Sequence, residues 1–171
     1  EGYLLVNEPL VRSTMEKAKK LGLKVALDLS NFNIVNAFKG MLEDIIPKYV
    51  DILFSNESEA EAFTGQKAAE AVHTLSELVE VSLVTLGKEG ALIGSHGQFY
   101  SVPAEGGKPV DTTGAGDNFA AGFLYGQSIG ASLVQSARIG SMLAGYVIDV
   151  VGPEISYDLS LIHISEPTRQ A

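Results

Sequence analysis

The chain has 171 residues, of which 46% are hydrophobic and 19% are charged, so it suits one globular domain with a substantial core and not a disordered chain. Its formal net charge is −9, which argues against nucleic-acid and anionic-membrane partners, because both kinds of surface attract clustered Lys and Arg. The sequence contains no cysteine, which excludes a disulfide framework and a thiolate metal site.

Strand-like and helix-like segments alternate along the chain. Short apolar runs predict strands at residues 2–6, 25–30, 51–56 and 81–87 and a hairpin within residues 91–104. The first helix is predicted after Asn7, which can cap it, with Pro9 in its first turn and Gly22 at its end. Further helices are predicted at about residues 35–46, 57–63, 68–79, 115–128 and 133–150. Pro47 is expected to end the helix that precedes it.

This order of elements favours an α/β fold with a mainly parallel sheet and helices on both faces. In such a sheet, ligands bind beyond the carboxyl ends of the strands. No apolar run approaches the ~18 residues of a membrane span. The N-terminal run EGYLLVNEP also lacks the basic start of a signal peptide. We therefore expect a soluble cytoplasmic protein with no membrane partner.

The stretch DTTGAGDNFAAGF, which begins at Asp111, joins a turn of small residues to an Ala-rich helix. A helix N-terminus carries unpaired N–H groups and a partial positive charge, and Gly114, Ala115 and Gly116 would let a phosphate approach them closely. Asp117 would repel that phosphate, so it needs a role there, and accepting a proton from an attacking hydroxyl is one. The alternative is a plain turn followed by an acidic first helical turn.

Two further motifs follow predicted strands. Asn56 and Glu59 are three residues apart, so they share a helix face and can hold waters around Mg²⁺. The same spacing is that of a capping box, and the two roles can coexist. Thr85, Gly87 and Gly90 leave room for the ribose and phosphates of a nucleotide, although a glycine turn between strands is the simpler interpretation.

In their order along the chain, the three motifs resemble those of the pfkB family of carbohydrate and nucleoside kinases, which has the three-layer ribokinase-like fold. The similarity covers about residues 2–152, and the run from Asp111 to Gly122 is its most specific part. The resemblance implies a phosphotransferase that moves the γ-phosphate of ATP to a hydroxyl of a small-molecule sugar or nucleoside. It also implies Mg²⁺ and, in many members, a monovalent cation such as K⁺.

The resemblance further implies a role for each site residue. Asp117 would be the base, and Gly114, Ala115 and Gly116 would supply the N–H groups of the anion hole. The residues that would border ATP or organise its phosphates are Asn56, Glu59, Thr85, Gly87, Gly90, Ala144 and Gly152. The residues that would serve metal ions are Glu59, through water to Mg²⁺, and Asp111 with the Thr113 carbonyl, at the monovalent cation.

Within the family, the runs GYLLVNEPLV and VALDLSNFNIVNAF are most similar to bacterial adenosine-kinase-type members, which favours an adenosine-like acceptor. A sugar kinase of ribokinase or fructokinase type and a non-catalytic nucleotide-binding fragment are the alternatives. Asp28-x-Ser30-x-Phe32 differs from the Asp-x-Asn-x-Arg pattern of 2-dehydro-3-deoxygluconate kinases, which counts against that substrate.

Members of the family are markedly longer than this chain. We therefore expect residues 1–158 to form a partial kinase domain that holds the ATP-binding and catalytic part, without the N-terminal part and its β lid. A homodimer is an expectation for the full-length protein, because many members pair through that lid. Residues 159–171 contain LSLIHISEPTR, which reads like the translation of a sequencing adapter, so we interpret them as an artefact.

Overall fold

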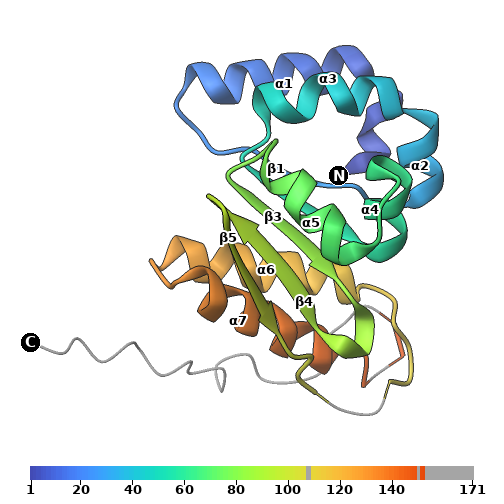
Figure 1. Ribbon diagram of the computed structural model, residues 1–171, viewed down its shortest axis with the longest axis vertical. Helices are drawn as coiled ribbons and strands as arrows, with labels where there is room; N and C mark the ends of the chain where they lie inside the picture. Colours follow the sequence, from blue (N-terminus) through green and yellow to red (C-terminus); the bar gives the residue numbers. More distant parts are fainter. Residues whose placement is uncertain (107–108, 150, 153–171) are drawn as a thin grey trace, which may run out of the picture. The chain divides into compact units, whose positions relative to one another are not determined.

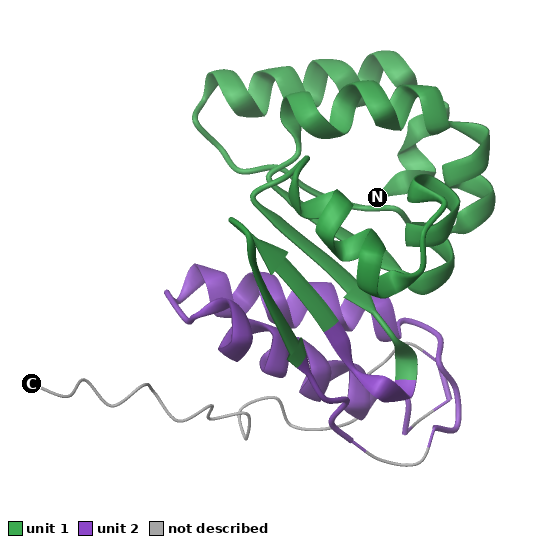
Figure 2. Ribbon diagram, in the orientation of Figure 1, with its two compact units in different colours: residues 1–87, 92–101 green, residues 88–91, 102–171 purple. Residues whose placement is uncertain are grey.

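The computed structural model describes residues 1–106, 109–149 and 151–152 (Figure 1). The interpretation of residues 159–171 as an adapter translation lies outside the described residues and stays a prediction. The chain divides into two compact units (Figure 2). Unit 1 comprises residues 1–87 and 92–101, and unit 2 comprises residues 88–91 and 102–171.

A sheet of five strands in the order β1-β2-β3-β4-β5 lies almost wholly within unit 1. The strands are β1 (Ala26–Asp28), β2 (Ile52–Asn56), β3 (Val81–Thr85), β4 (Ala91–Ser95) and β5 (Gln98–Val102). The first three strands pair in parallel, as expected. The links from β3 to β4 and from β4 to β5 are too short for a parallel crossover, so the chain reverses direction at each of them. The α/β prediction and the hairpin are thereby confirmed.

The helices of unit 1 lie before and between the three parallel strands in sequence and contribute to its core. They are the 3-10 helix η1 (Gly2–Val6) and the α-helices α1 (Glu8–Lys20), α2 (Phe32–Ala37), α3 (Lys39–Tyr49), α4 (Glu57–Thr64) and α5 (Ala68–Ser76). Ile45 of α3, Leu53 of β2 and Leu75 of α5 have no exposed surface and belong to one hydrophobic cluster. The first helix is capped as expected, because Leu10 N donates to Asn7 Oδ1 at 3.3 Å.

The strand predicted at residues 2–6 is wrong, because these residues form η1. A short apolar run carries no periodicity that separates strand from helix. In a 3-10 helix, positions three residues apart share a face, and Gly2 and Leu5 are the two buried residues of η1. Gly2 N also donates to Ser30 Oγ at 2.7 Å, which holds the segment beside the end of β1.

The helix predicted at residues 35–46 is wrong in both its extent and its end. The segment forms two helices, α2 and α3, which meet at Phe38. Asn31 starts α2 early, because Asn33 N donates to its side chain at 2.8 Å. Pro47 lies inside α3, and the last turn continues past it through Val50 N and Ile46 O at 3.1 Å.

In unit 2, the helices α6 (Ala115–Ser128) and α7 (Leu133–Val147) pack side by side (Figure 1). Small residues make this close contact possible. A Cβ added to Gly140 would lie 2.5 Å from the carbonyl oxygen of Phe119, and one added to Gly122 would lie 2.7 Å from Gly140 Cα. The two backbones therefore touch where a side chain would normally separate them.

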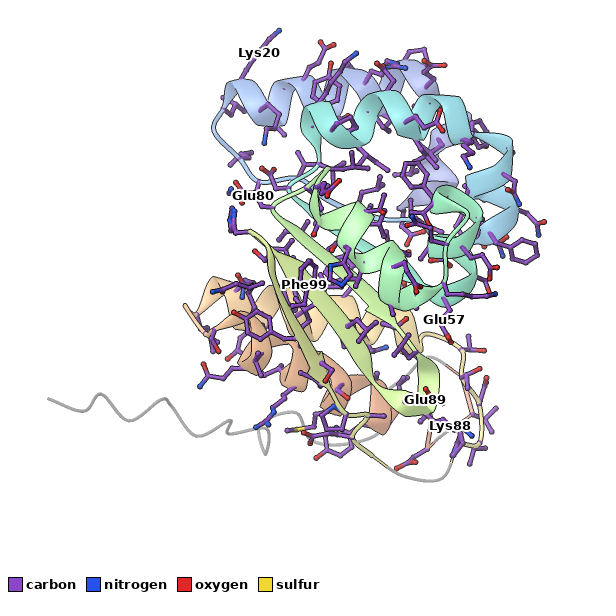
Figure 3. All side chains as sticks on the ribbon, in the orientation of Figure 1. Lys20, Glu57, Glu80, Lys88, Glu89 and Phe99 are labelled. Atoms are coloured by element: carbon purple, nitrogen blue, oxygen red, sulfur yellow. The ribbon has the colours of Figure 1, made fainter. Side chains whose placement is uncertain are left out.

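A buried carboxylate joins α1, β2 and the chain before β1. Asp51 is 5% exposed and accepts hydrogen bonds from Lys19 Nζ at 2.7 Å and from Val25 N at 2.7 Å. Lys24 Nζ lies 3.6 Å from Asp51 and also pairs with Glu80, which Figure 3 labels. Burial raises the pKa of Asp51, but the hydrogen bonds and the two lysine charges outweigh burial and leave the pKa below its ordinary value.

Replacing Gly140 with alanine should lower the free energy of unfolding of the chain by about 1–3 kcal/mol, because the new methyl group overlaps the Phe119 carbonyl. Gly40→Ala in α3 is the matched control, since nothing lies within 4 Å of its added Cβ. The control should raise stability by about 0.5–1 kcal/mol, because alanine favours a helix more than glycine does. Denaturant unfolding measures both, and an equal effect of the two changes would contradict the close contact.

Asp51→Asn should lower the free energy of unfolding by about 2 kcal/mol at neutral pH, because it removes the charge from buried hydrogen bonds. The folded-state pKa of Asp51 is depressed, so its stabilisation is complete above the unfolded value of about 3.9 and is lost as the pH falls through the folded value. The difference between the two proteins should therefore shrink in acid. Exposed Glu43→Gln is the control, and a pH-independent difference for Asp51→Asn would contradict this account.

Candidate functional site

The predicted site residues form two sets, one in each unit. The set in unit 1 is Asn56, Glu59, Thr85 and Gly87. The set in unit 2 is Gly90, Asp111, Thr113, Gly114, Ala115, Gly116, Asp117, Ala144 and Gly152. Within each unit, hydrogen bonds or strand pairing bring several members together.

Asn56 and Glu59 form a reciprocal capping box where β2 runs into α4. Glu59 N donates to Asn56 Oδ1 at 3.0 Å, and Asn56 N donates to Glu59 Oε2 at 2.9 Å. Asn56 Nδ2 also donates to Glu59 Oε1 at 2.6 Å. The capping interpretation of this motif is confirmed. Because a carboxylate has about four lone-pair sites, the capping box leaves Glu59 able to accept further hydrogen bonds.

Glu59 is an unusual cap because it is only 4% exposed. Burial raises its pKa, the hydrogen bonds from Asn56 lower it, and the charges of Asp28 and Glu1 raise it further, so the pKa lies above its ordinary value. A raised pKa means that holding a negative charge on Glu59 costs free energy. A cation beside Glu59 would offset that cost. The described residues contain no group of three or more Asp, Glu, His or Cys that could hold a metal ion. One carboxylate supplemented by water and phosphate oxygens is the donor set that suits Mg²⁺.

Thr85 lies directly across from Asn56 at the carboxyl ends of β2 and β3. Its hydroxyl donates to the Ser55 carbonyl at 3.4 Å, which anchors the side chain at this edge. The next residues turn sharply, with Gly87 at φ 54° and with open space around the position of its missing Cβ. Lys88 and Glu89 extend from the loop that follows β3 and are exposed (Figure 3).

Gly90 has a structural reason of its own to be glycine. Its φ is 100°, and an added Cβ would lie 1.9 Å from the Val102 carbonyl oxygen. Any side chain here would displace the backbone at Val102. The glycine-turn interpretation of this motif therefore accounts for Gly90, and the positive φ of Gly87 favours glycine there as well. The nucleotide interpretation stays a prediction.

Asp111 ties three parts of unit 2 together. Its carboxylate accepts from Thr113 N at 2.9 Å, from Thr113 Oγ1 at 2.7 Å and from Gly152 N at 3.0 Å. The hydrogen bonds from Thr113, and then the one from Gly152, hold the pKa of Asp111 below its ordinary value, which keeps it ionised. Asp111, Thr113 and Gly152 are thus in direct contact. Ala144 lies near the end of α7, where Ile148 N donates to its carbonyl at 3.3 Å.

Asp149 belongs to this neighbourhood, and the sequence interpretation did not single it out. The carbonyl of Ile148 accepts from Val110 N at 2.7 Å and from Asp111 N at 3.2 Å, so the segment after α7 runs beside Asp111. Asp149 Oδ1 is buried and has no hydrogen-bond partner among the described residues. In the sequence, Asp149 is an acidic residue within the apolar run VIDVV, and an acid in such a run indicates a buried charged group.

The N-terminus of α6 is left open by its sequence. Gly114 precedes the helix at φ 79°, and no side chain caps it, whereas Asn7, Asn31, Asn56 and Ser132 cap other helices. Ala115 N donates to the Thr112 carbonyl at 3.2 Å. In the part of the chain that the structure describes, no acceptor contacts Gly116 N or Asp117 N. Nothing lies within 4 Å of the Cβ position of Gly116, and Asp117 is exposed in the first turn.

This geometry is what binding of an anion requires. Free N–H groups at the positive end of a helix attract a phosphate, and the missing side chain at Gly116 lets it come close. Asp117 places a carboxylate on the same turn, where it can accept a proton from a hydroxyl. The N-terminus of α6 therefore has the features that the predicted anion hole and base need, and both roles stay predictions. Among the described helices, none is long and apolar enough to span a membrane.

A family model described as "pfkB family carbohydrate kinase" matches residues 5–158. An adenosine kinase of Saccharomyces cerevisiae is 32% identical over 165 residues, which cover 88% of this chain and 48% of the relative. Crystal structures of a probable sugar kinase from Rhizobium etli and of an adenosine kinase from Sinorhizobium meliloti both match with a TM-score of 0.88. They are 32% and 31% identical, over 94% of this chain and 50% and 51% of theirs. The chain therefore spans about half the length of these relatives, and the predicted ribokinase-like fold class is confirmed.

Glu59→Gln should become more stable relative to the unchanged chain as the pH rises above about 4, the ordinary pKa region of a glutamate. The folded pKa of Glu59 is raised, so the unchanged chain loses stability as the pH rises from the unfolded value toward the folded one. Glutamine keeps an oxygen that can accept from Asn56 N and carries no charge. Urea unfolding across this range measures the difference, and a relative stability that stays constant with pH would show that burial does not disfavour the Glu59 charge.

Proposed function

Because the chain belongs to the pfkB family of carbohydrate kinases, we propose that the protein carrying it is an ATP-dependent kinase of a small sugar or nucleoside hydroxyl. The observation that carries the proposal is the open N-terminus of α6, where the free N–H groups of Gly116 and Asp117 share one helical turn with the Asp117 carboxylate. An adenosine-like acceptor is favoured, because adenosine kinases are among the relatives that match most of the chain.

In the proposed reaction, the turn from Gly114 to Gly116 stabilises the phosphoryl group during transfer. The charge on that group is spread over its oxygens in the transition state, so positioning and electrostatic stabilisation are the main catalytic needs. Backbone N–H groups at a helix N-terminus supply both, because they are already oriented and need no rearrangement. Ala115 N is engaged by Thr112, so Gly116 N and Asp117 N are the principal donors of this proposal.

Asp117 is proposed as the base that accepts the proton of the acceptor hydroxyl. It is exposed in the first turn of α6, so a substrate can reach it. The hydroxyl oxygen then attacks the γ-phosphorus of ATP, the bond to ADP breaks, and the proton remains on Asp117.

The other site residues are proposed to hold ATP and its cations. Asn56 and Glu59 organise Mg²⁺ through water, and the raised pKa of buried Glu59 supports a cation beside it. When bound, Mg²⁺ neutralises part of the phosphate charge. The edge residues Thr85, Gly87 and Gly90 would border the ribose and phosphates. Asp111, Thr113, Ala144 and Gly152 are proposed to serve the adenine pocket and a monovalent cation such as K⁺.

The unpartnered oxygen of Asp149 supports the cation proposal. A buried carboxylate oxygen without a hydrogen bond costs free energy, and a positive ion nearby offsets that cost. The carbonyl of Ile148 accepts hydrogen bonds from Val110 N and Asp111 N, and the negative charge of ionised Asp111 also favours a cation in this neighbourhood. For the full-length protein, we also propose a cytoplasmic location and a homodimer.

A sugar kinase is the second candidate, because a probable sugar kinase matches the chain as well as an adenosine kinase does. The proposed roles of Asp117 and of the turn from Gly114 to Gly116 are the same for either acceptor. The experiment that separates the candidates is ADP release by the full-length protein with Mg-ATP and, in turn, adenosine, ribose and fructose. Release with adenosine alone supports the nucleoside kinase, and release with a sugar alone replaces it with the second candidate. Silence with every acceptor, together with binding of ATP, favours a non-catalytic nucleotide-binding protein.

Asp117→Asn in the full-length protein should lower the turnover number by about 10²–10⁴-fold, because the amide cannot accept the proton of the hydroxyl. The affinity for Mg-ADP should change little, since the backbone N–H groups remain. Glu43→Gln on the exposed surface of α3 makes the same acid-to-amide change away from the site and should keep full activity. Steady-state kinetics and calorimetry measure the two effects, and normal turnover by Asp117→Asn would remove it as the base.

A further inference from the structure

The turn before α6 is closed by the backbone hydrogen bond from Ala115 N to the Thr112 carbonyl, but no side chain caps the helix that follows. Gly114 has no side chain to cap the helix, and its left-handed φ of 79° is one that only glycine adopts readily. Gly116 contacts nothing within 4 Å of its Cβ position, so packing does not restrain it either. One flexible residue, Gly114, therefore precedes the two donors and a second, Gly116, carries one of them, at a point where the direction of the N–H groups matters.

Asn118 supplies a restraint from inside the helix. Its backbone N donates to the Gly114 carbonyl at 3.0 Å, which is the ordinary first bond of the helix. Its side-chain Nδ2 donates to the same carbonyl oxygen at 2.9 Å. Two donors on one oxygen fix the plane of the peptide that joins Gly114 to Ala115, and with it the path of the chain into the next two N–H groups.

The choice of a carbonyl as the partner is informative. A capping Ser or Asn at Gly114 would accept from the N–H groups of the first turn and would occupy them. Asn118 holds the same turn by donating, so Gly116 N and Asp117 N stay without a partner among the described residues. Asn is also a weaker helix former than Ala or Leu, so helix stability alone does not favour it at this position.

We infer that Asn118 is a positioning residue for phosphoryl transfer, which aims the N–H groups of Gly116 and Asp117 by holding the Gly114 carbonyl. The inference rests on the proposed function, because those N–H groups are the donors proposed to face the phosphoryl group. Asn118 acts through the backbone and need not touch the substrate. Donors aligned with the transferring group stabilise its transition state more than its ground state, so misalignment lowers turnover before it lowers nucleotide binding.

The test compares Asn118→Thr with Asn118→Val in the full-length protein. The two side chains have nearly the same shape and similar helix propensity, but only threonine can donate a hydroxyl to the carbonyl four residues earlier. We expect the threonine variant to stay close to the unchanged protein. The valine variant should lose about 10–100-fold in turnover number, which is below the cost of deleting an oxyanion donor outright. Its KM for ATP should change by less than about threefold.

A second readout does not depend on turnover. Mg-ADP with aluminium fluoride mimics the transferring phosphoryl group, so its affinity reports the aim of the N–H groups directly. The valine variant should bind this mimic more weakly and should keep its affinity for Mg-ADP alone. Gln127→Leu is the control at the other end of α6, because it removes hydrogen bonds to Ala131 and Ser136. It should lower thermal stability without changing the affinity for the mimic.

Equal turnover and equal mimic affinity in the threonine and valine variants would overturn the inference and leave the proposed function intact. A parallel loss for Gln127→Leu would also overturn it, because it would show a general effect of helix stability. Absence of turnover in the unchanged protein with every acceptor would instead overturn the proposed function, and the inference with it.

Discussion

The N-terminus of α6 is the constraint on which the proposed chemistry depends. The first N–H groups of a helix need partners from outside it, and four of the seven described α-helices use an Asn or Ser side chain for this purpose, whereas α3, α5 and α6 do not. At Gly114 the sequence withholds that side chain, and the unused donors become available to a ligand. The missing cap costs the folded chain little stability, because close packing against α7 holds α6 along the rest of its length.

Glu59 illustrates the opposite arrangement. Its carboxylate completes a capping box and is buried, and its pKa is raised by that burial and by the charges of Asp28 and Glu1. The structural and the proposed cation-binding roles therefore use the same atoms in different ways. Hydrogen bonds from Asn56 fix the direction of the carboxylate, and a bound cation would stabilise its charge. Such a group makes the folded chain more stable with its ligand than without it.

Most of the fold was predictable from the sequence, because its helices and strands differ in apolar spacing and have clear boundaries. The limits of α6 were predicted at residues 115–128, where Gly114 and Gly130 flank an Ala-rich run. The failures have local causes. Residues 2–6 form a 3-10 helix because contacts with residues 29–30 decide their structure, and a five-residue pattern does not contain that information. The break at Phe38 is likewise not marked at its own position, because the nearby Gly40 lies inside α3.

For the site, the sequence predicted residue types better than it predicted their partners. The capping box of Asn56 and Glu59 follows from spacing alone. The hydrogen bonds that Gly152 N donates to Asp111 and that Asn118 donates to the Gly114 carbonyl depend instead on the path of the backbone. Glycines show the same division. Gly90 and Gly140 are required because another backbone group occupies the place of a side chain, and Gly87 is favoured by its positive φ, but Gly116 faces open space without a positive φ. A glycine that neither packing nor φ requires, at the start of a helix, is better explained by the close approach of a ligand.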